Sequence, residues 1–167
     1  MWTHARRSTH GRQCGLQATL TQKASYDFER FMLAARDAAG LQTTNMAWTM
    51  VEGVFRTFRR RLTSDQVMRF AAALPPLVRA MFLERWHPTD PPVPFASMDN
   101  LTAEVQSLRE RHNFAPPNAI EAVAVALRSV VGDATLEDAL SSLPDAARAY
   151  WAVNSTRGLH RSQGSAA

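Results

Sequence analysis

Two Leu-Pro steps constrain the fold of this chain more than any other feature. Leu74-Pro75 and Leu143-Pro144 each end a run of apolar residues spaced three and four positions apart. Such spacing is typical of amphipathic helices. Proline removes an interior helical hydrogen bond and disfavours the α conformation of the residue before it. The sequence therefore predicts an all-α chain with a sharp corner between two helices at each proline.

The first half of the organised region predicts four helices. An apolar face begins at Phe28 and its helix stops at Gly40, and a second amphipathic helix follows. The segment 63–66, Thr-Ser-Asp-Gln, has the form of a capping box and opens a third helix. Pro76 suits the first position of a fourth, which we expect to run toward Trp86.

A proline-rich segment follows, with four prolines in the nine residues from His87 to Phe95. This density forbids a helix and gives a stiff, extended connection. After it, Ser97 caps another helix and the order long, long, short, short occurs again. We therefore divide the chain into a flexible basic leader at 1–24, a helical unit at 25–86, a Pro-rich linker at 87–96, a second helical unit at 97–153 and a flexible tail at 154–167.

The two units align with each other. Shifting residues 47–82 by 69 positions onto 116–151 makes apolar, proline and charged positions coincide. The coincident pairs include Val51 with Ile120, Glu52 with Glu121, Leu74-Pro75 with Leu143-Pro144, Arg79 with Arg148, and Phe82 with Trp151. We interpret the pattern as an internal duplication, so the predicted fold is two tandem four-helix units with about eight helices.

The same residues carry a family resemblance. They are the Phe28 helix, the run Leu62–Gln66 leading to Ala73-Leu-Pro75, Arg79, the exit Trp86-His-Pro88, and the second-copy residues Leu143-Pro144, Arg148 and Trp151. On these motifs the chain resembles the bacterial family of domain of unknown function 2267 (DUF2267), over about 25–153. The resemblance implies a duplicated helical architecture, and it implies no activity, cofactor or site residue.

The sequence pI of about 10.2 raises the question of nucleic-acid binding. The basic excess lies at the chain ends, since residues 1–23 and 153–167 hold six of the 19 basic residues and none of the 15 acidic ones. The region between them is slightly acidic. We therefore expect weak, non-specific attraction to nucleic acid to come mostly from the tails.

Four arginines near the end of the second predicted helix form a candidate anion or partner site. Three of them lie opposite the apolar face of the helix and the fourth at the flank of this ridge: Arg56, Arg59, Arg60 and Arg61. A ridge of this kind binds phosphate or an acidic partner, or is a solvated face near a helix C-terminus. Trp48 has no aromatic counterpart in the second unit, which favours a partner contact or a tryptophan at the edge of the core.

The duplication also retains two charge pairs. We interpret Glu52 with Arg79, and Glu121 with Arg148, as structural pairs that join one helix to another. A catalytic acid with an arginine clamp is the alternative interpretation.

Several function classes lack their usual signals. No apolar stretch is long enough to cross a membrane, and Cys14 is the only cysteine, which agrees with a cytoplasmic location. His4, His10 and Cys14 lie in the polar leader without a fixed geometry, so we expect no metal site. The chain has no glycine-rich phosphate loop, and we assign no catalytic residue and no cofactor.

The leading hypothesis is a non-enzymatic helical binding or regulatory module that acts on a protein partner or by self-association. The first alternative is nucleic-acid or phosphate binding through the basic tails and the Arg56/Arg59/Arg60 ridge. The second alternative is an enzyme whose active site the sequence does not reveal.

Overall fold

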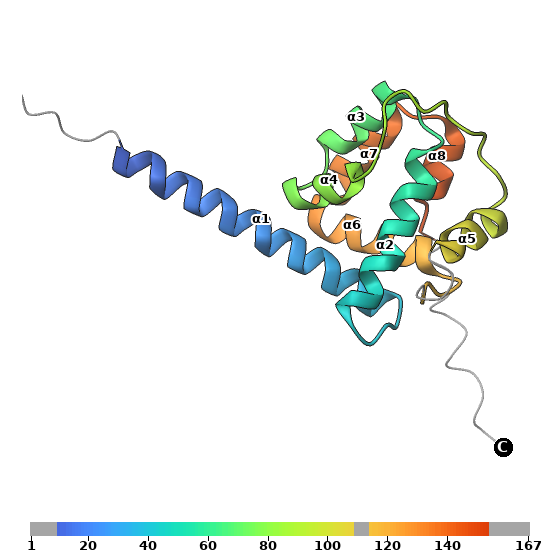
Figure 1. Cartoon of the computed structure of the whole chain (residues 1–167), viewed down its shortest axis with the longest axis horizontal. Helices are drawn as coiled ribbons and strands as arrows, with labels where there is room; N and C mark the ends of the chain where they lie inside the picture. The colour runs from blue at the N-terminus through green and yellow to red at the C-terminus, as the bar shows by residue number, and fades with distance from the viewer. Residues whose placement is uncertain (1–9, 109–113, 154–167) are drawn as a thin grey trace, which may run out of the picture.

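The computed structural model describes residues 10–108 and 114–153, with side chains from residue 19 onward. This part contains eight α-helices and no β-strand, which confirms the predicted all-α class. The helices gather in one bundle, from which the N-terminal part of α1 projects (Figure 1). They are α1 (His10–Ala38), α2 (Thr44–Arg59), α3 (Ser64–Ala72), α4 (Pro76–Leu83), α5 (Met98–Ser107), α6 (Ala119–Val131), α7 (Asp133–Ser141) and α8 (Asp145–Tyr150).

Local capping signals set several helix ends where the sequence predicted them. Thr63 Oγ1 accepts a hydrogen bond from the Gln66 backbone N–H at 3.4 Å, and Gln66 Oε1 accepts one from the Thr63 N–H at 2.9 Å. The Ser97 hydroxyl oxygen caps α5 by accepting from the Asn100 N–H. Gly40 follows α1 with φ 67°, a conformation that glycine adopts without steric cost.

The two Leu-Pro steps form the predicted corners. Pro75 lies between α3 and α4 with φ −56° and ψ 152°, and Pro144 lies between α7 and α8 with φ −55° and ψ 153°. No helix runs through either proline. The backbone therefore makes nearly the same corner twice, because the pyrrolidine ring fixes φ and denies the preceding helix a donor.

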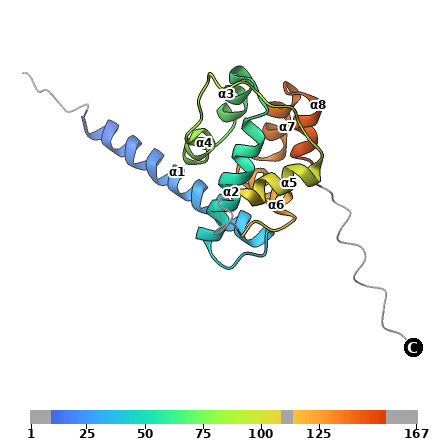
Figure 2. The same ribbon diagram turned by 45° about the vertical axis from the view of Figure 1, so that its right-hand side comes forward.

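The first helix begins earlier than we expected. Residues 10–24, which the sequence analysis assigned to a flexible leader, form the first turns of α1. This segment has no proline, and helix formers such as Arg12, Gln13 and Leu16 allow the helix to begin before the apolar face. Residues 19–30 include no buried side chain, and Figure 2 shows the same projection from a second side. The predicted flexibility of residues 1–9 and 154–167 lies outside the described residues.

The two predicted units share a single core. The most extensive contact of α1 is with α6, and α2 packs against α5 and α6 as well as against α1. Buried apolar side chains form one cluster from Phe31 to Trp151. Segment 87–96 is therefore not a boundary between two bodies, because short helices bury more apolar surface together than in separate units. The internal duplication stays a prediction.

Aromatic rings fill the centre of the core around Phe58. Its ring centroid lies 5.0 Å from those of Phe70 and Trp151, and 5.2 Å from that of Tyr150. The Tyr150 hydroxyl donates a 2.9 Å hydrogen bond to the carbonyl oxygen of Val54 in α2. The last helix thus closes the core over the second one.

The segment 87–96 contains no helix, as predicted, and runs along the bundle as an extended strap. The backbone N–H of Val93 donates a 3.0 Å hydrogen bond to the carbonyl oxygen of Arg60. The ring of Phe95 lies 6.4 Å from that of Phe58. These contacts hold the strap beside the C-terminal end of α2.

Candidate functional site

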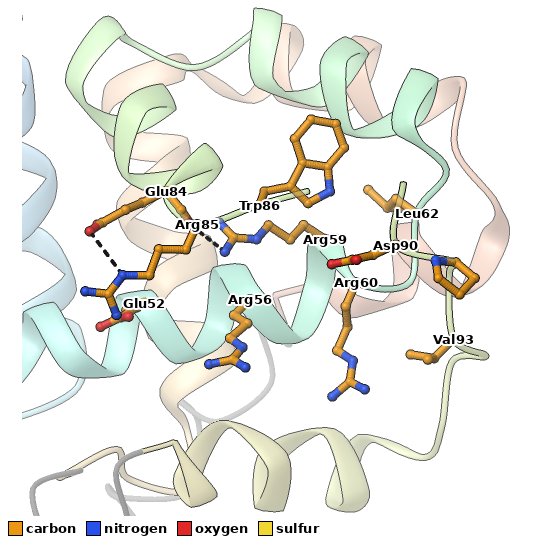
Figure 3. Close-up of a pocket in the computed structure, with 11 residues that line it drawn as sticks. Glu52, Arg56, Arg59, Arg60, Leu62, Glu84, Arg85, Trp86, Asp90 and Val93 are labelled. Carbon is orange, nitrogen blue, oxygen red and sulfur yellow. Dashed lines mark hydrogen bonds and ion pairs between the residues drawn. The ribbon is translucent and has the colours of Figure 1, made fainter. Parts of the chain in front are cut away.

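A hollow of about 410 Å³ lies between α2 and the chain that connects α4 to α5. Arginine is its commonest lining residue, and an indole and three carboxylates complete the wall (Figure 3). We name this hollow the arginine pocket. Its lining residues are Glu52, Arg56, Arg59, Arg60, Leu62, Glu84, Arg85, Trp86, Asp90, Pro91 and Val93.

Two of these arginines project outward from α2. Arg56 and Arg60 are four residues apart, so the helix places them on one face, and in Figure 3 both point toward α5. Arg60 donates a 3.1 Å hydrogen bond to a carboxylate oxygen of Glu104 in α5. Arg56 is exposed and forms no ion pair with a described residue. The Arg56 guanidinium is therefore open to an anion.

Arg59 points into the protein, so its predicted place on an exposed ridge is wrong. It is 7% exposed, its Nη2 donates a 2.6 Å hydrogen bond to the carbonyl oxygen of Glu84, and its Nη1 donates to that of Phe82. These carbonyls end α4, where a helix lacks its own donors and favours a nearby cation. Burial, followed by the neighbouring Arg56, lowers the pKa of the Arg59 guanidinium. Arg59 is a support of the pocket.

Arg61 is also buried, and its predicted place at the flank of the ridge is wrong as well. Its Nη2 lies 2.6 Å from Glu104 Oε2, and its Nη1 donates to the carbonyl oxygen of Thr57. Partial burial raises the pKa of Glu104, but Arg61 and Arg60 outweigh it and leave that pKa lowered. The end of α2 turns Arg59 and Arg61 inward because α4 and α5 pack beside it and supply acceptors.

The second wall of the pocket comes from the turn after α4. This helix was expected to run toward Trp86 and ends at Leu83, so Trp86 lies beyond it. Arg85 has φ 56° and is the one non-glycine residue in the described ranges with a positive φ. The left-handed conformation costs such a residue roughly 1–2 kcal/mol, and strained backbone of this kind clusters at functional sites. In Figure 3 the Arg85 side chain reaches from this turn toward α2.

The electrostatics of the pocket combine two open cations with several anions. Arg56 and Arg85 come from different elements and line the same hollow as the carboxylates of Glu52, Glu84 and Asp90. A guanidinium stays protonated and binds a carboxylate or phosphate through two parallel hydrogen bonds. The arrangement can therefore hold an anion, and the nearby carboxylates limit how much negative charge it accepts.

The family model described as "Uncharacterized conserved protein (DUF2267)" matches residues 28–150, most of the chain. The chain belongs to the DUF2267 family. All residues that line the arginine pocket lie within the range of the DUF2267 match, whereas the projecting part of α1 lies outside it. No curated protein matches the chain.

In this DUF2267 protein the arginines of the two expected charge pairs bind other partners. Arg79 donates hydrogen bonds to the carbonyl oxygens of Ala71 at 2.8 Å and Leu74 at 3.0 Å, which caps the end of α3 across the Pro75 corner. Arg148 pairs with a carboxylate of its own helix, that of Asp145. The predicted pairs were Glu52 with Arg79 and Glu121 with Arg148. Both arginines instead bind acceptors close to their own proline corner, and these acceptors differ between the two corners.

Trp48 lies at the edge of the core and outside the arginine pocket. Its ring meets that of Phe28 edge-on, with centroids 5.8 Å apart and an angle of 71°. The residue is still 40% exposed. This position agrees with a core-edge tryptophan and leaves part of the indole open to a partner.

The wall formed by Glu84, Arg85 and Asp90 was not predicted from the sequence. The available signal was a group of charged residues around Trp86, directly before the proline-rich segment. Neither a repeat partner nor a helical spacing connects these residues with Arg56. Only the folded chain places them on the same hollow.

The described residues contain no group of three or more His, Cys, Asp or Glu side chains that could hold a metal ion. None of their helices is both long and apolar enough to cross a membrane. Of the candidate ligands considered in the leader, His4 lies outside the described residues.

Proposed function

We propose that this protein is a non-enzymatic binding module that holds an acidic side chain of a protein partner in the arginine pocket. The observation that carries the proposal is that Arg56 and Arg85, from two different elements, line one hollow. Neither has a strong competing ion pair in the described part, since Arg85 Nε is 3.9 Å from Glu84 and both side chains are exposed. Such surface pairs contribute about 0–1 kcal/mol, so an incoming carboxylate displaces little.

The charge of the lining supports a carboxylate over a nucleic acid. Four arginines against three carboxylates leave only a small positive excess. Nucleic-acid binding draws on many phosphate contacts, and Arg59 and Arg61 are engaged with protein acceptors. The remaining open arginines suit a single acidic group.

The residue types support binding more than catalysis. Because a guanidinium does not deprotonate in proteins, Arg56 and Arg85 can hold an anion but cannot shuttle protons. Their supports are fixed by the hydrogen bonds from Arg59 to Glu84 and from Val93 to Arg60. A preorganised site loses less conformational entropy on binding.

Two expectations from the sequence accompany this proposal. A cytoplasmic location is supported by the single cysteine, Cys14, which cannot form an internal disulfide. An internal duplication is supported by the nearly equal dihedral angles at Pro75 and Pro144.

The test is an NMR titration of the full chain with hexaglutamate, with hexaglutamine as the neutral control. We expect hexaglutamate alone to shift the Trp86 indole N–H and the Arg85 amide. Replacing Arg56 and Arg85 by glutamine should weaken binding by about tenfold or more, because each charge-assisted hydrogen bond contributes about 1.5–3 kcal/mol. Arg69→Gln is the matched control, since Arg69 is an exposed arginine on α3 that pairs with Asp65.

Two results would overturn the proposal. One is the absence of a Trp86 or Arg85 response, and the other is equal binding by wild type and the double variant. If a short oligonucleotide binds more tightly than hexaglutamate, and the double variant loses both, the ligand class is nucleic acid rather than an acidic protein segment.

A further inference from the structure

A second hollow, of about 350 Å³, lies among α1, α2 and α4. Its lining is apolar except for one carboxylate, and we name it the tryptophan groove. Its lining residues are Phe28, Trp48, Leu77, Ala80, Met81 and Glu84.

The tryptophan groove presents large apolar side chains to solvent. Trp48 and Leu77 are each 40% exposed. Trp48 is held edge-on by Phe28, so its ring is not free to fold onto the surface. A rigid, partly exposed aromatic ring beside aliphatic side chains is typical of a pocket that receives an apolar anchor of a partner.

Glu84 connects this groove with the arginine pocket. It lines both hollows, and its carbonyl oxygen accepts the 2.6 Å hydrogen bond from Arg59. The two hollows therefore meet at one fixed residue at the end of α4.

A stripe of side chains on α2 makes the same connection. Trp48, Glu52 and Arg56 follow one another at four-residue intervals, the spacing that keeps side chains on neighbouring turns of a helix face. Trp48 lines the groove, while Glu52 and Arg56 line the pocket. At 1.5 Å per residue, Trp48 and Arg56 are about 12 Å apart along the helix.

We propose that the tryptophan groove and the arginine pocket form one docking surface for a segment of a protein partner that carries a large apolar residue and an acidic residue about 12 Å apart. The inference rests on the proposed function and specifies its partner. The apolar residue fills the groove beside Trp48 and Leu77, and the carboxylate reaches Arg56 and Arg85. Charge complementarity orients the segment along α2.

Short peptides test the spacing directly. In an extended chain four residues span about 13 Å, so the peptide acetyl-Leu-Ser-Gly-Ser-Glu-amide places its two anchors at the required distance. We expect it to bind the full chain about tenfold or more tightly than a version with serine in place of leucine or a version with glutamine in place of glutamate, because each of these versions lacks one of the two anchors. The peptide acetyl-Ser-Gly-Ser-Leu-Glu-amide has the same composition with leucine and glutamate adjacent. It should bind no more tightly than the version without leucine.

Variants of the groove separate this inference from the proposed function. Leu77→Ser and Trp48→Ala should each reduce the affinity for acetyl-Leu-Ser-Gly-Ser-Glu-amide to that of the version with serine in place of leucine. The affinity of both variants for hexaglutamate should equal that of the wild type. Met68→Ser is the control, because Met68 is a 52% exposed apolar residue outside both hollows. Leu77→Ser keeps the test valid if Trp48→Ala fails to fold.

Three outcomes would overturn the inference. If hexaglutamate binds but the leucine peptide binds no more tightly than its serine version, the arginine pocket acts alone and only the proposed function stands. If the adjacent-anchor peptide binds as tightly, the two hollows are not one surface. If the chain forms a dimer in sedimentation experiments that Leu77→Ser abolishes, the occupant of the groove is a second copy of this chain.

Discussion

The guanidinium of Arg59 donates a 2.6 Å hydrogen bond to the carbonyl oxygen of Glu84, which joins a buried side chain of α2 to the residue before Arg85. The pocket wall that carries Arg85 is therefore anchored in the core. Its geometry depends on Arg59, which lines the pocket and also holds the end of α4.

Replacing Arg59 by glutamine should destabilise the protein by about 2–3 kcal/mol, because the end carbonyls of α4 lose their charged donor. The measurement is urea unfolding followed by circular dichroism. Arg56→Gln is the matched control on the same helix and should change stability by about 0.5 kcal/mol or less, since Arg56 is exposed. Equal stability of the Arg59 variant and wild type would show that the cap is unimportant.

Tyr150→Phe should cost about 1 kcal/mol near neutral pH, because the 2.9 Å hydrogen bond to Val54 is lost. Burial, the largest cause, raises the pKa of Tyr150 well above its usual value of 10.0. A raised folded-state pKa stabilises the fold below the unfolded pKa, and that stability is lost as the pH rises above it. The phenylalanine variant should therefore lose less stability than wild type in unfolding experiments taken through alkaline pH.

Glu104→Gln should destabilise the protein near pH 7, because the buried Arg61 loses its carboxylate partner. The pKa of Glu104 is lowered in the fold, so its contribution is present above the unfolded pKa and is lost as the pH falls through the folded pKa. The stability difference between variant and wild type should thus shrink as the pH falls below the usual carboxyl range. Unfolding curves at neutral and acid pH measure it, and a pH-independent difference would contradict the ion-pair explanation.

Gly53→Ala should destabilise the protein by about 1–3 kcal/mol. A methyl group at Gly53 would lie 3.0 Å from the carbonyl oxygen of Val105 and 3.2 Å from its Cγ1, where α2 crosses α5. In an unconstrained helix the same change stabilises by about 0.5–1 kcal/mol, so the sign of the effect reports the close crossing. Thermal unfolding measures the change in stability. Val105→Ala should destabilise the Gly53→Ala variant less than it destabilises the wild type, because the two residues are in contact.

Removing positive charge near the two ends of the chain should weaken non-specific nucleic-acid binding. The change replaces five arginines by glutamine: Arg6, Arg7, Arg12, Arg157 and Arg161. At about 50 mM salt, affinity for a short single-stranded oligonucleotide should fall about tenfold or more, because fewer counterions are released. Fluorescence anisotropy measures the affinity, and retained binding that Arg56→Gln removes would assign it to the arginine pocket.

Most of the helices, several of their ends and the proline corners could be predicted from the sequence because these features depend on near neighbours. A threonine three residues before a glutamine satisfies the first amides of α3 wherever that helix lies. Pro75 and Pro144 break helices for a reason internal to the residue. The apolar spacing also identified core residues such as Val51, Ile120 and Phe82.

The directions of the arginines depended on distant segments. The four arginines at the end of α2 look alike in sequence, yet Arg59 and Arg61 turn inward because carbonyl and carboxylate acceptors arrive from α4 and α5. Arg56 and Arg60 stay outside and line the pocket. Helical periodicity by itself could not show that buried acceptors would compensate the burial of a charge.

The sequence alone thus determined most of the helical segments of this chain and the places where it must turn, since those choices depend on side chains within a few residues of one another. Only the tertiary structure decided that α1 packs on α6, so that the predicted units share one core, and that the turn after α4 brings Arg85 to the same hollow as Arg56. The physical reason is that burial and charge compensation depend on groups far apart in the chain, which become neighbours only when the helices pack.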